Sequence, residues 1–282
     1  MIGDGIQPGN RLWTPWRMAY VGGSAKSAEC VFCVAAAGDD DVSSLILHRG
    51  EHVFVIMNLF PYNTGHLMVV PYDHVNDLAA LSVAARSELI ELTAAFTTGL
   101  TRVMGSEGIN LGMNLGAAAG AGIADHLHQH LVPRWIGDAN FMPLVGGTKV
   151  LPELLPATYG KLRAELVRQR SGVTEAQVVL MAPNGRSVYL DRGDLLRVRL
   201  RDGEPVWRAV VRNLHPAAAS LNLLGWAGPQ DVRDDMHVPL VAYEFTPSPE
   251  AHYSEVLVSR IASNSLTDGE LQAIEAAVRR YT

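Results

Sequence analysis

Three histidines at alternate positions carry the strongest chemical signal in this chain. His126, His128 and His130 lie in the run His-Leu-His-Gln-His. In an extended strand, side chains point alternately to the two faces, so these imidazoles share one face, with neighbours about 7 Å apart. Imidazole can act as nucleophile, proton carrier and metal ligand near neutral pH. The spacing predicts a functional row along one strand, and the alternative is a solvent-facing strand that happens to be rich in histidine.

A second motif precedes this row. Residues 57–71 read Met-Asn-Leu-Phe-Pro-Tyr-Asn-Thr-Gly-His-Leu-Met-Val-Val-Pro, the pattern of two strands joined by a turn. Together the motifs resemble the histidine-triad (HIT) family of nucleotide hydrolases and transferases, whose signature is a His-x-His-x-His strand after a Gly-His-x-x-Val-x-Pro strand. The resemblance covers about residues 10–170, and segments 11–18 and 137–141 look most like the actinobacterial diadenosine tetraphosphate phosphorylase branch.

The resemblance implies roles for two of the three histidines. His128 is the expected nucleophile, which attacks the α-phosphorus of a nucleotide and forms a nucleotidyl-histidine that a second acceptor cleaves. His130 is expected to donate a proton to the bridging oxygen of the leaving group, or to hydrogen-bond it. Relatives with other chemistry carry Gln at this third position, whereas this chain keeps His.

Substrate contacts are expected around the row. The small residues of 116–122 leave room for backbone amides to approach a phosphate, although a flexible connector would look the same. The resemblance adds a ribose contact, a phosphate contact and three positions of the phosphorylase-like segment. The expected substrate-binding residues are Asn58, Asn114, Gly120, Gly122, Asn140, Gly147 and Thr148. Many relatives have a hydroxyl side chain shortly before the first histidine, but residues 122–125 offer none here.

Both cysteines of the chain lie in one Cys-x-x-Cys pair, Cys30 and Cys33. Two thiolates supply half of a tetrahedral zinc site, and the βαβ context of a thioredoxin-like redox motif is absent. In metal-containing relatives of the family, the other two ligands correspond to His74 and His126. We therefore expect a structural Zn²⁺, and the alternative is a pair of inert small side chains in a turn.

Composition limits the classes of protein to consider. The chain has 282 residues, 48% of them hydrophobic, and a formal net charge of −6. This composition supports a sizeable core, and the net charge does not favour nucleic acid as a partner. Apolar runs are short and the first residues lack a basic, apolar signal, so we expect a cytoplasmic protein that does not interact with membranes.

The residue pattern predicts an α+β fold for the first half. Strands are expected at 53–58, 67–71, 109–115 and 127–133, long helices at 81–104 and within 151–170, and a loop at 25–41. These elements make an antiparallel sheet with flanking helices, as in the HIT fold. We expect a HIT nucleotide-binding catalytic domain at residues 1–171, and family resemblance implies a homodimer.

Residues 172–282 are predicted to form a second, smaller β-rich α+β domain of unknown function. Strands are expected at 177–181, 187–190, 195–200, 206–211 and 238–245, followed by a final helix.

The resemblance favours nucleotidyl transfer on diadenosine polyphosphates, with phosphate or water as acceptor. Two alternatives stay open. One is a non-catalytic nucleotide sensor with a protein-binding C-terminal domain, and the other is a dedicated biosynthetic enzyme that uses the same histidine chemistry on an unusual nucleotide.

Overall fold

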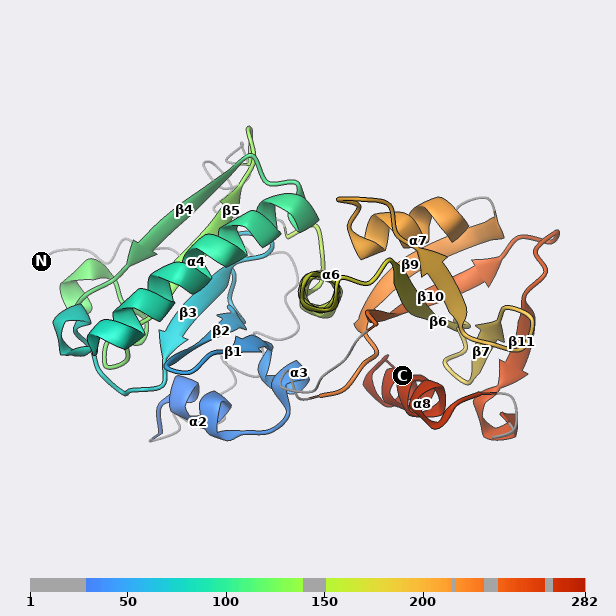
Figure 1. Cartoon of the computed structure of the whole chain (residues 1–282), viewed down its shortest axis with the longest axis horizontal. Helices are drawn as coiled ribbons and strands as arrows, with labels where there is room; N and C mark the ends of the chain where they lie inside the picture. The colour runs from blue at the N-terminus through green and yellow to red at the C-terminus, as the bar shows by residue number, and fades with distance from the viewer. Residues whose placement is uncertain (1–28, 139–150, 215–216, 231–237, 262–265, 282) are drawn as a thin grey trace, which may run out of the picture.

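The fold is seen in a computed structural model that describes residues 29–138, 151–214, 217–230, 238–261 and 266–281. The chain forms two sheets side by side, with helix α6 (Leu155–Ser171) between them (Figure 1). The predicted α+β class is confirmed.

The first sheet has five strands in the order β1-β2-β3-β5-β4, and every pair is antiparallel. The strands are β1 (Ile46–Arg49), β2 (Val53–Met57), β3 (Leu67–Pro71), β4 (Gly108–Met113) and β5 (Gln129–Arg134). Its helical elements are α2 (Val31–Ala37), α3 (Asp41–Ser44), α4 (Val83–Met104) and the 3₁₀ turns η1 (Leu78–Ala80) and η2 (Ala117–Ala119).

Strands β2 and β3 are apolar and buried along their whole length because both faces of the sheet are covered. Alternate residues such as Val55 and Val69 join the core beneath α4. Their neighbours Ile56 and Met68 pack on the opposite face, with Phe32 of α2. α4 begins at Ser82, which accepts the amide hydrogen of Ala85, and ends at a left-handed glycine, Gly105.

The second sheet has the path β11-β7-β6-β10-β9, with β8 paired to β6 outside this path. Its β6–β10 pair is parallel and its other pairs are antiparallel. α6 and α7 pack on one face of this sheet and α8 packs on the other. The elements are β6 (Glu175–Met181), β7 (Ser187–Leu190), β8 (Leu196–Arg199), α7 (Val206–Leu214), β9 (Ala218–Trp226), β10 (Leu240–Pro247), β11 (Ser254–Leu257), η4 (Val258–Arg260) and α8 (Asp268–Tyr281).

Helix α6 belongs to the cores of both halves. Tyr159 donates a hydrogen bond to the carbonyl of Ile46 in β1, at 2.9 Å, and buried Arg163 donates one to the carbonyl of Leu47. On the side of the second sheet, the Arg163 guanidinium lies 5.5 Å from the ring of Trp226. One continuous hydrophobic cluster therefore runs from the first sheet through α6 into the second. The boundary between two domains at residues 171 and 172 stays a prediction, and it falls at the end of this shared helix.

Two predicted elements are wrong. Residues 206–211, expected as a strand, lie in helix α7, where Val206, Ala209, Val210 and Leu214 form the buried stripe. Their three- and four-residue spacing is helical, but the short segment is also rich in β-branched valine. The expected loop at 25–41 contains α2, and α3 begins at its last residue, Asp41. Asp41 itself is fully buried against Arg49.

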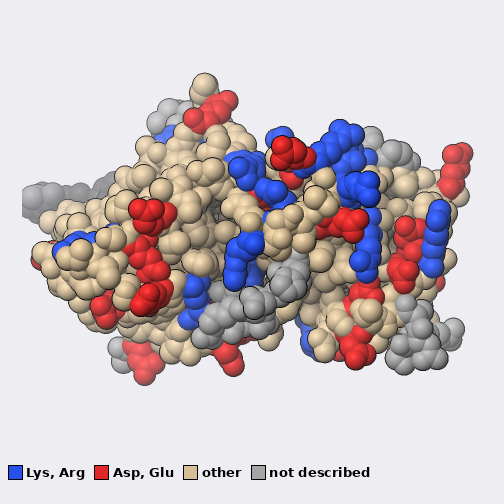
Figure 2. Space-filling view, in the orientation of Figure 1, with Lys and Arg blue, Asp and Glu red and all other residues tan. Residues whose placement is uncertain are grey.

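Acidic and basic side chains lie over both halves on the face of Figure 2, and several of the protein's basic groups are paired. Arg102 and Arg168 both contact Glu165, Lys161 contacts Glu153, and Arg212 contacts Glu204. Among the described residues, no helix combines the length and apolar character that crossing a membrane requires.

The contact between α6 and β9 gives a test of the shared core. A Cβ added at Gly160 would lie 2.6 Å from the backbone carbon of Gly225, whereas one added at Gly99 in α4 would meet nothing within 4 Å. We expect Gly160→Ala to lower the free energy of unfolding by about 1–3 kcal/mol through overpacking. Gly99→Ala should raise it by about 0.5–1 kcal/mol. Urea unfolding of both variants checks this, and equal effects would contradict the close packing.

Candidate active site and metal cluster

The histidine row lies at the start of β5, on the face of the sheet opposite α4. His126, His128 and His130 are all buried, while Leu127 and Leu131 between and after them pack into the core beneath α4. β5 is held on both sides, because Met68 of β3 and Gly112 of β4 both pair with His130. The rings of His128 and His130 have their centroids 4.8 Å apart. The alternation predicted from the sequence therefore brings the imidazoles to one face.

His128 is oriented by its own backbone. Its Nδ1 lies 2.8 Å from the carbonyl oxygen of His126, and because a carbonyl can only accept, Nδ1 carries the hydrogen. The second nitrogen, Nε2, then carries the lone pair of a neutral ring. A nucleophilic imidazole needs this arrangement.

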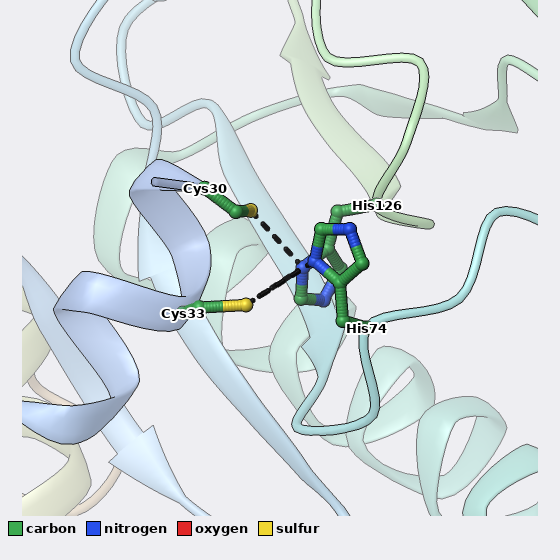
Figure 3. A group of neighbouring side chains, drawn as sticks. All are labelled: Cys30, Cys33, His74 and His126. Carbon is green, nitrogen blue, oxygen red and sulfur yellow. Dashed lines mark hydrogen bonds between the residues drawn. The ribbon is translucent and has the colours of Figure 1, made fainter. Parts of the chain in front are cut away.

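The ring of His126 points towards the cysteines (Figure 3). Its Nε2 donates to the carbonyl of Pro71, at 2.9 Å, so its Nδ1 presents a lone pair to Cys30 Sγ at 3.2 Å. His74 Nδ1 lies 3.3 Å from Cys33 Sγ, and all four ligand atoms lie within 4.8 Å of one another. The four residues predicted as metal ligands thus form one cluster that could hold a metal ion.

The donor set fits a tetrahedral metal. Zinc binds thiolate sulfur at about 2.3 Å and imidazole nitrogen at about 2.0–2.1 Å, which places ligand atoms of a tetrahedron about 3.5 Å apart. The sulfur-to-nitrogen distances from Cys33 to His74 and His126 are 3.3 and 3.6 Å. Two sulfurs and two nitrogens at these separations match a closed structural site.

α2 links the metal cluster to the row. Its residue Phe32 packs its ring against His126 and His128, with centroid distances of 5.4 and 5.1 Å. The other end of the helix is held by Arg49, which donates to the carbonyls of Ala36 and Gly38 and forms a buried ion pair with Asp41. The buried guanidinium of Arg49 therefore offsets the partial negative charge of the carbonyl groups at the C-terminal end of α2.

A fourth histidine, His66, completes the site, and the sequence reasoning gave it no role. It is fully buried just before β3, and its Nε2 lies 2.9 Å from Nδ1 of His130. The exposed ring of Tyr62 lies beside both imidazoles, 4.7 Å from His66 and 5.6 Å from His130. The signal was available, since His66 is the histidine of the Gly-His-x-x-Val-x-Pro motif.

The structure describes four of the seven predicted substrate-binding residues. Asn58 lies beside His66, where its Oδ1 accepts the amide hydrogen of Phe60 and its Nδ2 is 3.4 Å from His66 Nδ1. Asn114 follows β4 directly, one position beyond the pair of Met113 with Gln129, and so reaches the level of His128. Gly120 and Gly122 are both exposed; Gly120 has a positive φ of 82°, and a Cβ added at either glycine would meet nothing within 4 Å. Asn140, Gly147 and Thr148 lie outside the described residues.

Burial affects the protonation of the row. Desolvation, with a smaller contribution from neighbouring His128, lowers the pKa of His130 from 6.5 to about 4. Desolvation also lowers the pKa of His126. His130 is therefore neutral near pH 7, and its Nε2 has no hydrogen-bond partner among the described residues. A neutral ring with a buried, unpaired nitrogen is suited to meet a ligand atom.

Comparison with known proteins identifies the family that the sequence matches. Residues 40–135 match the HIT domain family. The AP-4-A phosphorylase of Mycobacterium tuberculosis is 42% identical over 168 residues, which cover 56% of this chain and 85% of that protein.

Two solved structures are also similar. A Zn-bound histidine triad family protein from Mycobacterium smegmatis has 26% identity and a TM-score of 0.38, over 51% of this chain and 98% of that one. A hypothetical histidine triad nucleotide-binding protein from Sulfolobus tokodaii has 21% identity and a TM-score of 0.42, over 51% and 96% of the two chains.

The lowered pKa of His130 predicts how stability changes with pH. The unfolded chain takes up a proton at this residue near pH 6.5, while the folded protein resists it down to a pKa of about 4. Between these values the unfolded state binds more protons, so the free energy of unfolding should decrease as the pH falls through this window. Urea unfolding at about pH 7 and pH 5 should show a smaller loss for His130→Gln than for the wild type. An equal loss in both proteins would contradict the assignment to His130.

Proposed function

Because this chain belongs to the histidine-triad family, we propose that it is a nucleotidyl-transferring enzyme for diadenosine polyphosphates, with a covalent AMP-histidine intermediate on His128. The phosphorylase relative supports the substrate class and favours phosphate over water as the acceptor. The cytoplasmic location stays a prediction.

The observation that carries the proposal is the orientation of His128. The hydrogen bond from its Nδ1 to the His126 carbonyl leaves the Nε2 lone pair as the reactive nitrogen of a neutral ring. A neutral imidazole approaches the anionic oxygens of a phosphate at a lower electrostatic cost than a carboxylate would. In the first step, the Nε2 lone pair forms a bond to the α-phosphorus, and the bond from phosphorus to the bridging oxygen breaks.

The second step returns His128 to its starting state. An oxygen of the acceptor attacks the same phosphorus, and the phosphorus–nitrogen bond breaks with its electron pair returning to Nε2. Phosphate as acceptor yields ADP, and water yields AMP. Asn114 and the amides around Gly120 are the described groups that we expect to bind the phosphate oxygens.

A non-catalytic sensor is the weaker candidate. A protein that only binds a nucleotide has no need to hold one imidazole with its lone pair ready and a second one, His130, beside it at 4.8 Å. The missing hydroxyl before His126 keeps a biosynthetic enzyme for an unusual nucleotide as a further alternative.

The metal proposed for the Cys30, Cys33, His74 and His126 cluster is a structural Zn²⁺. The support is the donor set and its spacing, which leave no ligand position for a substrate. A bound ion would supply no chemistry to the transfer step; it would fix α2 to the turn after β3 and to the start of β5. His126 would then orient His128 through its carbonyl while its ring binds the metal.

A homodimer is proposed through the open edge of the first sheet. β4 is the last strand in the order, and α4 leaves its outer part uncovered, so that Leu111 is 52% exposed. An apolar edge strand with unpaired backbone groups is suited to antiparallel pairing with a second copy.

The central experiment identifies products and the intermediate. Diadenosine tetraphosphate incubated with millimolar phosphate should yield ADP and ATP, whereas AMP and ATP would indicate water as the acceptor. His128→Ala should lower turnover by several orders of magnitude with nucleotide affinity within about tenfold, since it removes the attacking atom and little ground-state contact. His252→Ala, in an exposed position of the second half, is the matched control. Multiple turnover by His128→Ala would contradict the nucleophile assignment.

For the metal, purified protein should contain about one zinc per chain, as a four-ligand structural site requires. Cys30→Ser should lose both the zinc and thermal stability, because an ion that binds only the folded protein stabilises it. Elemental analysis and a melting curve measure these effects. If protein prepared without chelators contains no metal, the metal proposal fails and the two cysteines are inert side chains.

For the dimer, Leu111→Lys should give monomers in sedimentation velocity experiments at concentrations where the wild type is dimeric, because it places a charge in the paired edge. Val83→Lys replaces another exposed apolar residue, at the start of α4, and should leave the dimer intact. A monomeric wild type, or a dimer that survives Leu111→Lys, would exclude this interface.

A further inference from the structure

We propose that a groove along helix α8, in the second half of the chain, binds a nucleotide, with its phosphate at Arg279 and Arg280 and its base at Gln272. The groove is lined by residues between 177 and 280 and includes no residue of the histidine row. It gives the second half, whose sequence suggested no function, a binding site of its own. The inference goes beyond the proposed transfer reaction and does not depend on His128 as the nucleophile.

The groove exists because the residues on two neighbouring sides of α8 differ in size. On one side, the large residues Ile274 and Val278 pack on the second sheet. On the other, Ala273 and Ala276 line the groove, and a Cβ added at Gly269 would meet nothing within 4 Å. These small residues leave an open volume of about 700 Å³. Small-molecule sites in proteins have volumes of roughly 300–1,000 Å³, so the groove is large enough for a nucleotide.

The wall opposite α8 is held in place by the rest of the protein. It includes residues 227–230, which follow β9. Trp226 is fully buried, and its indole N–H donates to the carbonyl of Pro229 at 3.0 Å. Nε2 of Gln230 donates to the Asp40 carboxylate of the first half at 3.2 Å. Because these protein contacts fix the wall, little of a ligand's binding free energy is needed to order it.

Two arginines at the C-terminal end of α8 supply the positive charge for an anion. Nη1 of Arg280 donates to the carbonyls of Trp226 and Gly228, at 3.1 and 3.0 Å, which fixes the plane of its guanidinium. Its Nε and Nη2 hydrogens have no partner among the described residues, and this edge of a guanidinium matches two oxygens of a phosphate. Arg279 lies 3.6 Å from Glu275, but both side chains are exposed. An exposed ion pair contributes little, so Arg279 can turn to a ligand.

The groove keeps this positive charge because its acidic residue is already paired. Glu270 is the one carboxylate among the described residues that line the groove. One of its oxygens accepts from Gln177 and Arg197, and the other accepts from the N–H and hydroxyl of Thr267. Glu270 also lies nine residues before Arg279, about 14 Å along the helix axis. An anion at the arginines therefore meets no unpaired carboxylate of the groove.

The middle of the groove selects a nucleotide over a simple anion. Gln272 is exposed, and its amide has no partner among the described residues. A glutamine amide offers a donor and an acceptor side by side, the pattern that pairs with the edge of a base such as adenine. Gln272 lies two turns before Arg279, about 10 Å along the axis, so a ligand that reaches both must carry a ring at one end and an anion at the other. Between them, Ala273 and Ala276 give an apolar surface for a planar group.

Equilibrium dialysis of the full chain with AMP counts the sites. AMP is a suitable probe because it carries no leaving phosphate and is not consumed. The wild type should bind two AMP per chain, one in the groove and one at the histidine row. Ala276→Trp should bind one, because the indole fills the groove. Ala84→Trp, the same change at an exposed position of α4, should still bind two. Two AMP bound by Ala276→Trp would overturn the proposal.

A second variant and two ligand fragments test the assigned contacts without changing the core. Arg279→Ala should weaken AMP binding in the groove about tenfold through loss of a charged hydrogen bond. Arg186→Ala, at an exposed arginine outside the groove, is the matched control. Adenosine and ribose 5-phosphate, measured as the difference between the wild type and Ala276→Trp, should each bind the groove more weakly than AMP. Equal affinity of the two arginine variants, or of either fragment and AMP, would overturn the proposal.

Failure of the proposed function gives a different result from failure of the groove. If the histidine row does not bind nucleotides, the wild type binds one AMP and Ala276→Trp binds none, and the groove site stands. If the wild type and Ala276→Trp both bind one AMP, the groove is not a nucleotide site, while binding at the row stands. A wild type that binds no AMP would overturn the groove proposal as well.

Discussion

The position of β5 between β3 and β4 is the constraint on which the site depends. With Met68 on one side and Gly112 on the other, the register of His130 is fixed by backbone hydrogen bonds in both directions. A shift by one residue would exchange the histidines with Leu127 and Leu131 and bury three imidazoles beneath α4. The hydrophobic core that makes such a shift costly is therefore also what aligns the polar row.

The three histidines of the row are alike in sequence but differ in their hydrogen bonds. His126 donates from Nε2 to Pro71 and faces the cysteines through Nδ1, and His128 donates from Nδ1 to a carbonyl. The Tyr62 N–H donates to His66 Nδ1, so neutral His66 donates from Nε2 to Nδ1 of His130. Each contact leaves a different nitrogen available, which gives a ring that faces the cysteines, a ring with a lone pair and a ring with an N–H. Fixed partners, rather than differences in residue type, separate these roles.

The sequence predicted those parts of the fold and site that depend on local spacing. Period-two histidines, apolar β2 and β3, and the long amphipathic α4 were all expected from their patterns. Prediction was wrong where short segments carry a mixed signal, as in α7, or where an acidic residue such as Asp41 is buried by a distant partner. The role of His66 depends on its contact with His130 of β5, and the merging of the two cores depends on Gly160 meeting Gly225. Contacts across long stretches of chain have no periodic signature.

The contact of Arg49 with α2 has a consequence for the metal cluster. Because a buried guanidinium binds the last carbonyls of α2 and the Asp41 carboxylate, the helix is held in place by protein groups at the end remote from the cysteines. An ion that enters the cluster therefore meets thiolates already carried on an ordered helix, and little of its binding free energy is spent on the conformational entropy of that segment. Such a preorganised site can release and rebind an ion without refolding the helix that carries its two sulfur ligands.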